Sequence, residues 1–148
     1  MKKIYCIEVI VIILLLSCKS SSTQNTLNNK PMKDTGTLQG TWQLKSLPGI
    51  SIAFEKLYPK KIPVIVFDLE QKIASGHTGC NSFSGKLDKD GFAIKFMEPV
   101  SMTNRFCTGE GESIFMQRVK EVSSYSVTKD SLLTLFKGET AILEMTKK

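Results

Sequence analysis

His77 and Cys80 come closest to a reactive pair among the residues of this chain. A cysteine and a histidine can act as nucleophile and general base when a third group orients the base. The two residues stand three positions apart in a segment typical of a strand and a turn, where that spacing brings their side chains poorly together. No Asn or Asp is identifiable as the orienting group. We therefore expect no catalytic residue and no enzyme activity, hydrolysis included.

A metal centre is disfavoured on similar grounds. His77, Cys80, Cys107 and one acid would have to supply the ligands, and their spacing matches no zinc pattern. Asp88 and Asp90 lie at a hairpin and lack the alternate acidic positions and terminal Glu of a calcium loop. We expect neither a metal nor an organic cofactor.

The N-terminus carries a different kind of chemistry. Two lysines precede an unbroken apolar run from Val9 to Leu16, which is far shorter than the about 20 residues of a membrane-spanning helix. The following Leu-Leu-Ser-Cys18 resembles the bacterial lipobox, in which the thiol receives a diacylglycerol and cleavage makes the cysteine the new N-terminus. We expect residues 1–17 to be a lipoprotein signal peptide and Cys18 to be the lipidation site. The alternative is an uncleaved anchor helix with an incidental cysteine.

Residues 18–36 are rich in Ser, Thr, Asn and Lys and offer little apolar surface to bury. We interpret them as a lipidated flexible tether that spans about 25 Å. Lys19, next to the lipidated cysteine, is unlike an Asp-type inner-membrane retention signal and favours the outer membrane. The expected location is therefore the cell envelope, with the lipid anchor as the contact to the membrane. Whether the domain faces the periplasm or the cell surface stays open.

Composition places the rest of the chain among ordinary globular proteins. It is 41% hydrophobic and 23% charged, which excludes wholesale disorder. The formal net charge is +6, and nearly all basic residues are Lys, with only Arg105 and Arg118 besides. No basic cluster with interleaved aromatic residues is present, so we expect no nucleic-acid partner. The lysines favour proximity to anionic headgroups or serve solubility alone, and we expect a monomer.

Residues 37–148 show mostly alternating hydrophobicity, typical of short strands. The exception is Glu110–Ser123, whose apolar residues recur at helical spacing, with Thr108 as the candidate N-cap. The pattern predicts an α+β fold of seven or eight antiparallel strands with one late helix. Strands are expected at 38–47, 63–70, 72–78, 83–87, 91–97, 125–128, 132–136 and 141–145, whereas 53–58 is either a helical turn or a loop. Aromatic residues expected in the core are Trp42, Phe67, Phe92, Phe96 and Phe115.

Two cysteines remain after the leader is removed and Cys18 is lipidated. Cys80 and Cys107 lie in turn-rich segments of an exported domain, where disulfides persist. A bridge between them would stabilise the fold by roughly 3.5 kcal/mol in the chain-entropy estimate. Two neighbouring reduced thiols are the alternative.

The segment 76–85, GHTGCNSFSG, is the most specific in the chain. Gly79 and Gly85 permit backbone angles closed to other residues, Asn81 suits an Asx-turn, and Phe83 can anchor the segment in the core. We interpret it as a tight structural turn, with a ligand-contacting loop as the alternative.

This segment and its flanks resemble the signature of the META domain, or HslJ-like, family. The flanks are LQGTWQL at 38–44, the strand at 63–68, Met102-Thr103 with Cys107 four residues on, and the Phe115 helix. The resemblance implies a compact antiparallel, barrel-like β domain packed on a helix, and no established catalytic residues. It also implies that Cys80 and Cys107 lie close in space. Family members are commonly small envelope proteins, many with lipoprotein signals, and the HslJ name is associated with heat stress.

Two functions follow as hypotheses. The first is a non-catalytic envelope lipoprotein that binds a partner or supports the envelope under stress. The second is a pilotin- or lipocalin-like module that binds lipid or peptide in an apolar pocket of a few hundred Å³. A filled barrel interior would count against the second.

Overall fold

The alternating segments form strands, and the late amphipathic segment forms a helix, in a computed structural model that describes residues 36–128 and 131–148. The expected leader, Cys18 and nearly all of the tether lie outside the described residues. In chain order the elements are β1 (Gly40–Ser46), α1 (Phe54–Leu57), β2 (Val64–Asp68), β3 (Ile73–His77), β4 (Ser82–Asp90), β5 (Ala93–Phe96), β6 (Ser101–Met102), α2 (Gly111–Glu121), β7 (Ser124–Val127), β8 (Leu132–Lys137) and β9 (Thr140–Lys147).

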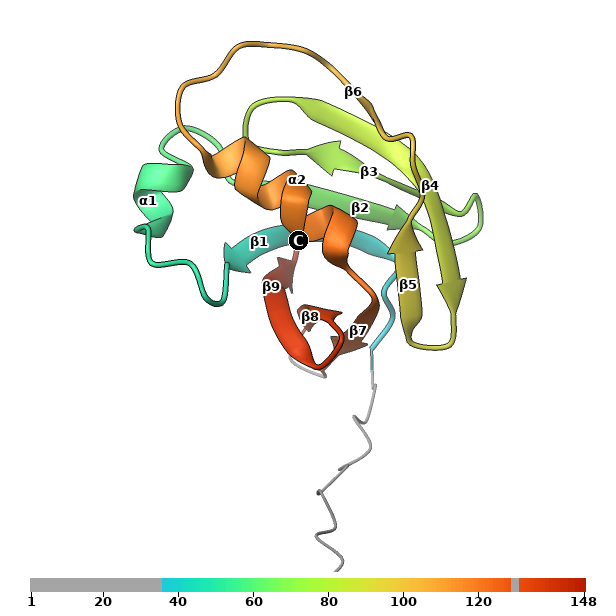
Figure 1. The fold of residues 1–148 in the computed structure, drawn as a ribbon. Helices are drawn as coiled ribbons and strands as arrows, with labels where there is room; N and C mark the ends of the chain where they lie inside the picture. Colours follow the sequence, from blue (N-terminus) through green and yellow to red (C-terminus); the bar gives the residue numbers. More distant parts are fainter. Residues whose placement is uncertain (1–35, 129–130) are drawn as a thin grey trace, which may run out of the picture. The chain divides into compact units, whose positions relative to one another are not determined.

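The strands close into a ring. Their order is β3-β2-β1-β9-β8-β7-β5-β4-β6, and a further pairing of β3 with β4 joins the two sides. All of these pairings are antiparallel, and β6 lies outside the ring on the edge of β4. Figure 1 shows the ring with α2 lying across it. The barrel-like α+β fold that the sequence and the family resemblance predicted is confirmed.

Side chains fill the inside of this ring. The inward faces of the strands supply fully buried residues, and α2 adds Phe115 and Val119 to the same cluster. Trp42 is completely buried, and its indole N–H donates to the Leu38 carbonyl oxygen at 2.7 Å. Because the one polar atom of this large ring is satisfied, Trp42 can occupy the core without a desolvation penalty.

Two local predictions were wrong, and one short strand was missed. Phe92 is 52% exposed because it stands in the turn beyond the last β4–β5 pair, Asp90 with Ala93; its ring meets that of Tyr125 edge-on. Thr108 does not cap α2: Glu110 occupies the N-cap position, without a capping hydrogen bond from its side chain. The two-residue strand β6 was not predicted, since so short a segment has no measurable period.

Within residues 36–128 and 131–148, no helix is long and apolar enough to cross a membrane.

Candidate functional site

The sequence motif forms the connection between β3 and β4. The Thr78 hydroxyl oxygen accepts the N–H groups of Cys80 at 3.2 Å and Asn81 at 2.9 Å, and the Thr78 N–H donates to the Asn81 carbonyl at 2.8 Å. Gly79 has φ +94°, and a Cβ there would lie 2.7 Å from the Lys61 carbonyl oxygen. Only glycine fits this position without strain, so the tight turn inferred from the residue types is what the structure shows.

Asn81 joins this turn to two other segments. Its side chain is almost completely buried, at 2% exposure. The amide oxygen accepts the Thr103 hydroxyl and the Arg105 N–H, each at 2.8 Å, and the amide nitrogen donates to the Arg105 carbonyl at 3.0 Å. Asn81 therefore holds the segment that leads to α2, in place of the local Asx-turn that the sequence suggested; the Thr78 hydroxyl makes the side-chain bonds of the turn instead.

Glu112, in the first turn of α2, is the third member of this cluster. One carboxylate oxygen accepts the Thr78 hydroxyl at 2.6 Å and the Asn81 N–H at 3.1 Å, and the Asn81 amide nitrogen lies 2.9 and 3.0 Å from the two oxygens. A carboxylate in the first turn of a helix also suits the positive end of the helix dipole. The partners of Glu112 stand about thirty positions earlier in the chain, and no local pattern reports such a contact.

A disulfide links Cys80 to Cys107 in the structure, with a Cα–Cα distance of 6.1 Å. Cys107 lies in the exposed loop between β6 and α2, so the bridge fastens this loop to the motif turn. The alternative of two reduced thiols is not what the structure contains.

The other motif residues serve packing. Phe83 is buried, and its ring meets the edge of Phe115 with centroids 6.2 Å apart, which anchors β4 under α2. Gly85 does not have the left-handed backbone that the sequence suggested: its φ is not positive, and its missing side chain leaves room for Val100, whose Cγ2 would lie 3.2 Å from a Cβ.

His77 is only half-buried and lies beside cations. Burial, followed by the charges of Lys61 and Lys148, lowers the pKa of His77 below its usual value. Its Nδ1 accepts the Gly79 N–H at 3.4 Å. At neutral pH the ring is therefore a neutral neighbour of the turn.

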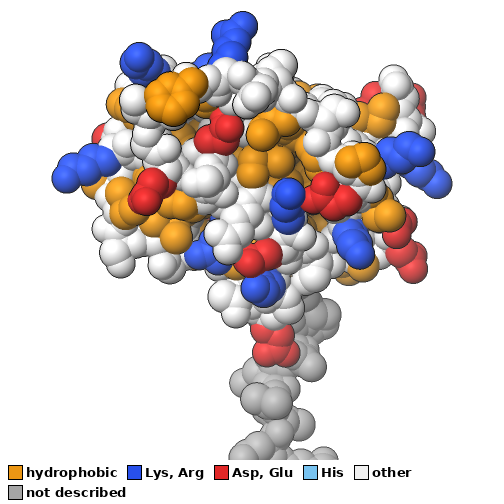
Figure 2. Space-filling model, turned by 45° about the horizontal axis from the view of Figure 1, so that its top comes forward, with side chains coloured by type: hydrophobic (Ala, Val, Ile, Leu, Met, Phe, Trp, Pro, Cys, Tyr) orange, Lys and Arg blue, Asp and Glu red, His pale blue; other side chains and the backbone are white. Residues whose placement is uncertain are grey.

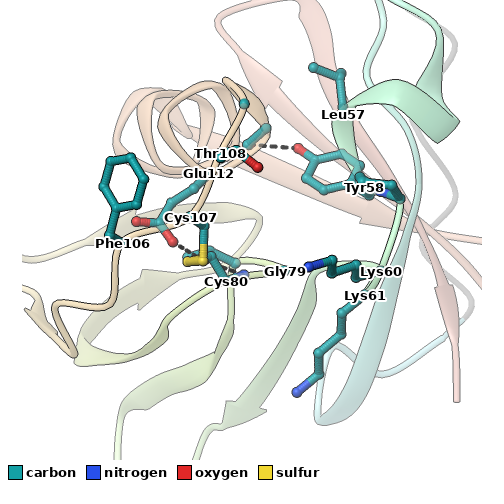
Figure 3. A pocket seen from close by; sticks show the side chains of 14 residues that line it. Leu57, Tyr58, Lys60, Lys61, Gly79, Cys80, Phe106, Cys107, Thr108 and Glu112 are labelled. Carbon is teal, nitrogen blue, oxygen red and sulfur yellow. Dashed lines mark hydrogen bonds between the residues drawn. A yellow bond between two sulfur atoms is a disulfide. The ribbon is translucent and has the colours of Figure 1, made fainter.

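A pocket of about 250 Å³ opens between the motif turn, the segment after α1 and the start of α2. Figure 3 shows the disulfide at its centre, with Phe106 on one side and Lys60 and Lys61 on the other. Tyr58 forms part of the wall and donates its hydroxyl to the Gly111 carbonyl at 2.8 Å. Burial raises the pKa of Tyr58 well above its usual range, which keeps this donor protonated.

A second hollow, of about 600 Å³, is also lined by Phe106 and includes Met102, Arg105 and Met116. Phe106 lines both hollows and is 93% exposed. Figure 2, which brings this end of the domain forward, shows apolar side chains at the surface beside separate cationic ones. The sequence did not single out Phe106, because an exposed aromatic residue in a loop has no periodic signal.

A comparison of the sequence with models of known protein families identifies the domain. The family model of the META domain matches residues 36–148. The chain belongs to the META domain family. No curated protein sequence matches the chain at a significant level.

Solved structures share the fold of this META domain. A protein from Burkholderia xenovorans, determined by NMR, has a TM-score of 0.57 at 20% identity, over 74% of this chain and 82% of its own. A DUF4847 family protein from Bacteroides vulgatus, determined by crystallography, has a TM-score of 0.53 at 12% identity, over 74% and 93%. At these identities the likeness concerns the fold.

The polar groups of the META motif are bonded to one another and do not form a reactive set. The Thr78 hydroxyl donates its proton to Glu112, and its oxygen accepts two backbone N–H groups, which leaves no lone pair for attack on a substrate. Cys80 has no thiol, since its sulfur is in the disulfide. The described residues, 36–128 and 131–148, contain no group of three or more His, Cys, Asp and Glu side chains placed to hold a metal.

Proposed function

We propose that the protein is a non-catalytic bacterial envelope lipoprotein, anchored through Cys18, whose META domain acts by binding a partner in the envelope. The leader and the Leu-Leu-Ser-Cys18 sequence support the anchor. A contribution to envelope integrity under heat stress would follow from such binding.

One observation carries the binding role. Inside the site, the hydroxyl, amide and carboxylate groups form hydrogen bonds with each other. At its surface, an aromatic ring and cationic side chains are exposed and have no such partner among the described residues. A rigid surface that presents an aromatic ring and cationic side chains to solvent suits recognition of a partner and supplies no nucleophile or general base for catalysis.

The filled ring counts against a lipocalin-like mode of lipid binding. Trp42, Phe67 and Leu133 are fully buried in one cluster that occupies the interior. A lipid chain would have to displace such side chains, and creating the space costs several kcal/mol. The outer surface of the domain is the better place for a ligand.

Labelling with radioactive palmitate tests the anchor. We expect the full chain, expressed with its own leader in a Gram-negative host, to incorporate label and to fractionate with the outer membrane. Cys18→Ser should lose both, whereas Cys6→Ser, which alters a cysteine inside the leader, should keep both. An unlabelled wild type that fractionates as Cys18→Ser does would overturn the proposal. Cross-linking in the intact envelope then tests the binding role, and a wild type that gives no cross-linked species would contradict it.

A further inference from the structure

Phe106 is exposed although its loop is firmly attached on both sides. The preceding residue, Arg105, is held by the Asn81 side chain through its N–H and its carbonyl, and the following residue is the disulfide-bonded Cys107. The 93% exposure of the ring is thus built into the backbone and is not a property of a loose tip. Rigid aromatic side chains presented in this way lose little entropy when they bind.

The surroundings of Phe106 are concave. The two hollows, of about 250 and 600 Å³, are both lined by Phe106, and both are large enough for a side chain. Met102, 46% exposed, and Met116 add apolar surface to the larger hollow. An extended segment that crosses Phe106 would place neighbouring side chains in the two hollows and pack against the ring.

The net charge of the residues that line the two hollows is positive. Lys60 and Lys61 line the smaller hollow and Arg105 lines the larger. Across the described ranges, none of the three side chains makes a hydrogen bond or an ion pair with a carboxylate. The carboxylate that lines both hollows, Glu112, already accepts hydrogen bonds on both oxygens from Thr78 and Asn81. A partner with negative charge would complement the cations.

We propose that Phe106 and the cations Lys60, Lys61 and Arg105 form a docking surface for an acidic peptide segment of another protein, with an apolar side chain at its centre. The proposal rests on the binding role proposed above and names the class of partner. In Figure 1 the loop between β6 and α2 lies at the top of the domain, whereas the described chain begins at the bottom. The two hollows, which fit side chains, favour a peptide over a membrane surface.

Synthetic peptides test the proposal with the full chain. The probe is a short fluorescent peptide with a central Phe between runs of Asp and Glu; one control replaces the acidic residues by Lys, and another replaces Phe by Gly. We expect the acidic Phe peptide to bind at least about tenfold more tightly than either control, and the affinity to fall with added salt. Equal binding of all three peptides, or no binding of any, would refute the proposal.

Matched variants locate the surface. Phe106→Ala should weaken binding about tenfold, and Lys60→Ala with Lys61→Ala severalfold, because each removes one proposed contact. Phe92→Ala and Lys95→Ala, which alter an exposed ring and a cation on the β4–β5 hairpin, should bind as wild type does. Equal loss in the two sets would place the peptide elsewhere and contradict the proposal.

Vesicles of phosphatidylglycerol and phosphatidylethanolamine test a membrane surface as the alternative partner. Binding to vesicles that is lost in Phe106→Ala, without peptide binding, would replace the peptide by a membrane surface. Failure here is distinguishable from failure of the proposed function. Palmitate labelling and cross-linking that persist in Phe106→Ala leave the lipoprotein and its binding role standing.

Discussion

At the scale of single residues, the Asn81 side chain forms hydrogen bonds to more separate segments than any other polar side chain described. It connects the β3–β4 turn, the loop that bears Phe106 and the start of α2, and it is buried. A buried amide with both ends satisfied specifies one arrangement of its neighbours, since any other arrangement leaves a polar atom without a partner. The motif asparagine thus positions the proposed docking surface without touching a ligand.

Asn81→Ala should lower the free energy of unfolding by about 3 kcal/mol, because several buried hydrogen bonds are lost at once. Asn81→Asp keeps the shape but sets a carboxylate against Glu112 in place of the amide donor. Its destabilisation should be larger at pH 7 than in acid, where protonation relieves the repulsion. Urea unfolding at both pH values measures this, with the exposed Ser82→Ala as control. A deficit of Asn81→Asp that does not change with pH would contradict the repulsion argument.

His77 gives the domain a measurable pH dependence. Because its pKa is lowered in the folded state, the unfolded chain takes up a proton first as the pH falls below about 6.5. The associated stability is therefore complete above that pH and is lost as the pH falls toward the folded-state pKa. His77→Gln should flatten the stability profile in this window, as followed by urea unfolding.

The same histidine is the only one in the chain, so its imidazole signal can be titrated by NMR without overlap. Lys61→Gln should raise the pKa of His77 but leave it below the usual value, since burial is the larger cause and remains. Lys95→Gln, on another strand, should leave the titration unchanged. An unchanged midpoint in Lys61→Gln would show that the lysine charge is fully screened.

At the scale of elements, α2 begins against the segment that contains α1. A Cβ at Gly111 would collide with the Leu57 carbonyl oxygen and lie 2.8 Å from a ring carbon of Tyr58. In an exposed helix, Gly→Ala stabilises by about 1 kcal/mol. Here we expect Gly111→Ala to destabilise by about 1–3 kcal/mol, because the contact is with backbone that cannot easily move.

Thermal unfolding compares Gly111→Ala with Gln117→Ala, an exposed position of the same helix, which should be neutral or slightly stabilising. The Gly111 variant should also disturb the Tyr58–Gly111 hydrogen bond and with it the smaller hollow. A gain in stability for Gly111→Ala would mean that α1 and α2 separate at little cost.

The elements also show what the sequence could reveal. In β2 Phe67 is buried, as predicted, and Ile65, two positions earlier, lies on the same face, because the face of a strand follows from its period. Phe92 alternates in the sequence with Ile94 and Phe96 of β5, but it lies in the turn just before that strand. Its burial there depends on how far the hairpin extends, which the period does not report. The link between Asn81 and Glu112 was beyond prediction for another reason: it depends on where α2 crosses the ring, which no local pattern encodes.

At the scale of the whole molecule, the ring is held by the fewest strand pairs where β5 meets β7, a contact that we call the joint. Short connections join consecutive strands from β2 to β5 and from β7 to β9. β1 reaches β2 through the segment that contains α1, but it pairs with β2 from Gly40 to Gln43 and with β9 from Trp42 to Ser46. Between β5 and β7 the chain instead passes through β6 and α2, and the strands meet only at Ala93 and Ser124. Flanking bonds from Ile94 N–H to Ser123 and from Tyr125 N–H to Phe92, both at 3.1 Å, complete this joint.

Hydrogen exchange tests whether the ring opens there first. We expect the amides of Ile94 and Tyr125 to exchange well before the slowest amides of β8 and β9, since few bonds must break to separate β5 from β7. Phe92→Ala removes the ring contact across the joint, 6.1 Å between centroids, and should speed exchange at Tyr125 while β8 and β9 keep their rates. Met97→Ala, exposed beyond the end of β5, is the matched control. Equal protection of all these amides would show instead that the ring opens only when the whole domain unfolds, with α2 holding the joint closed from above.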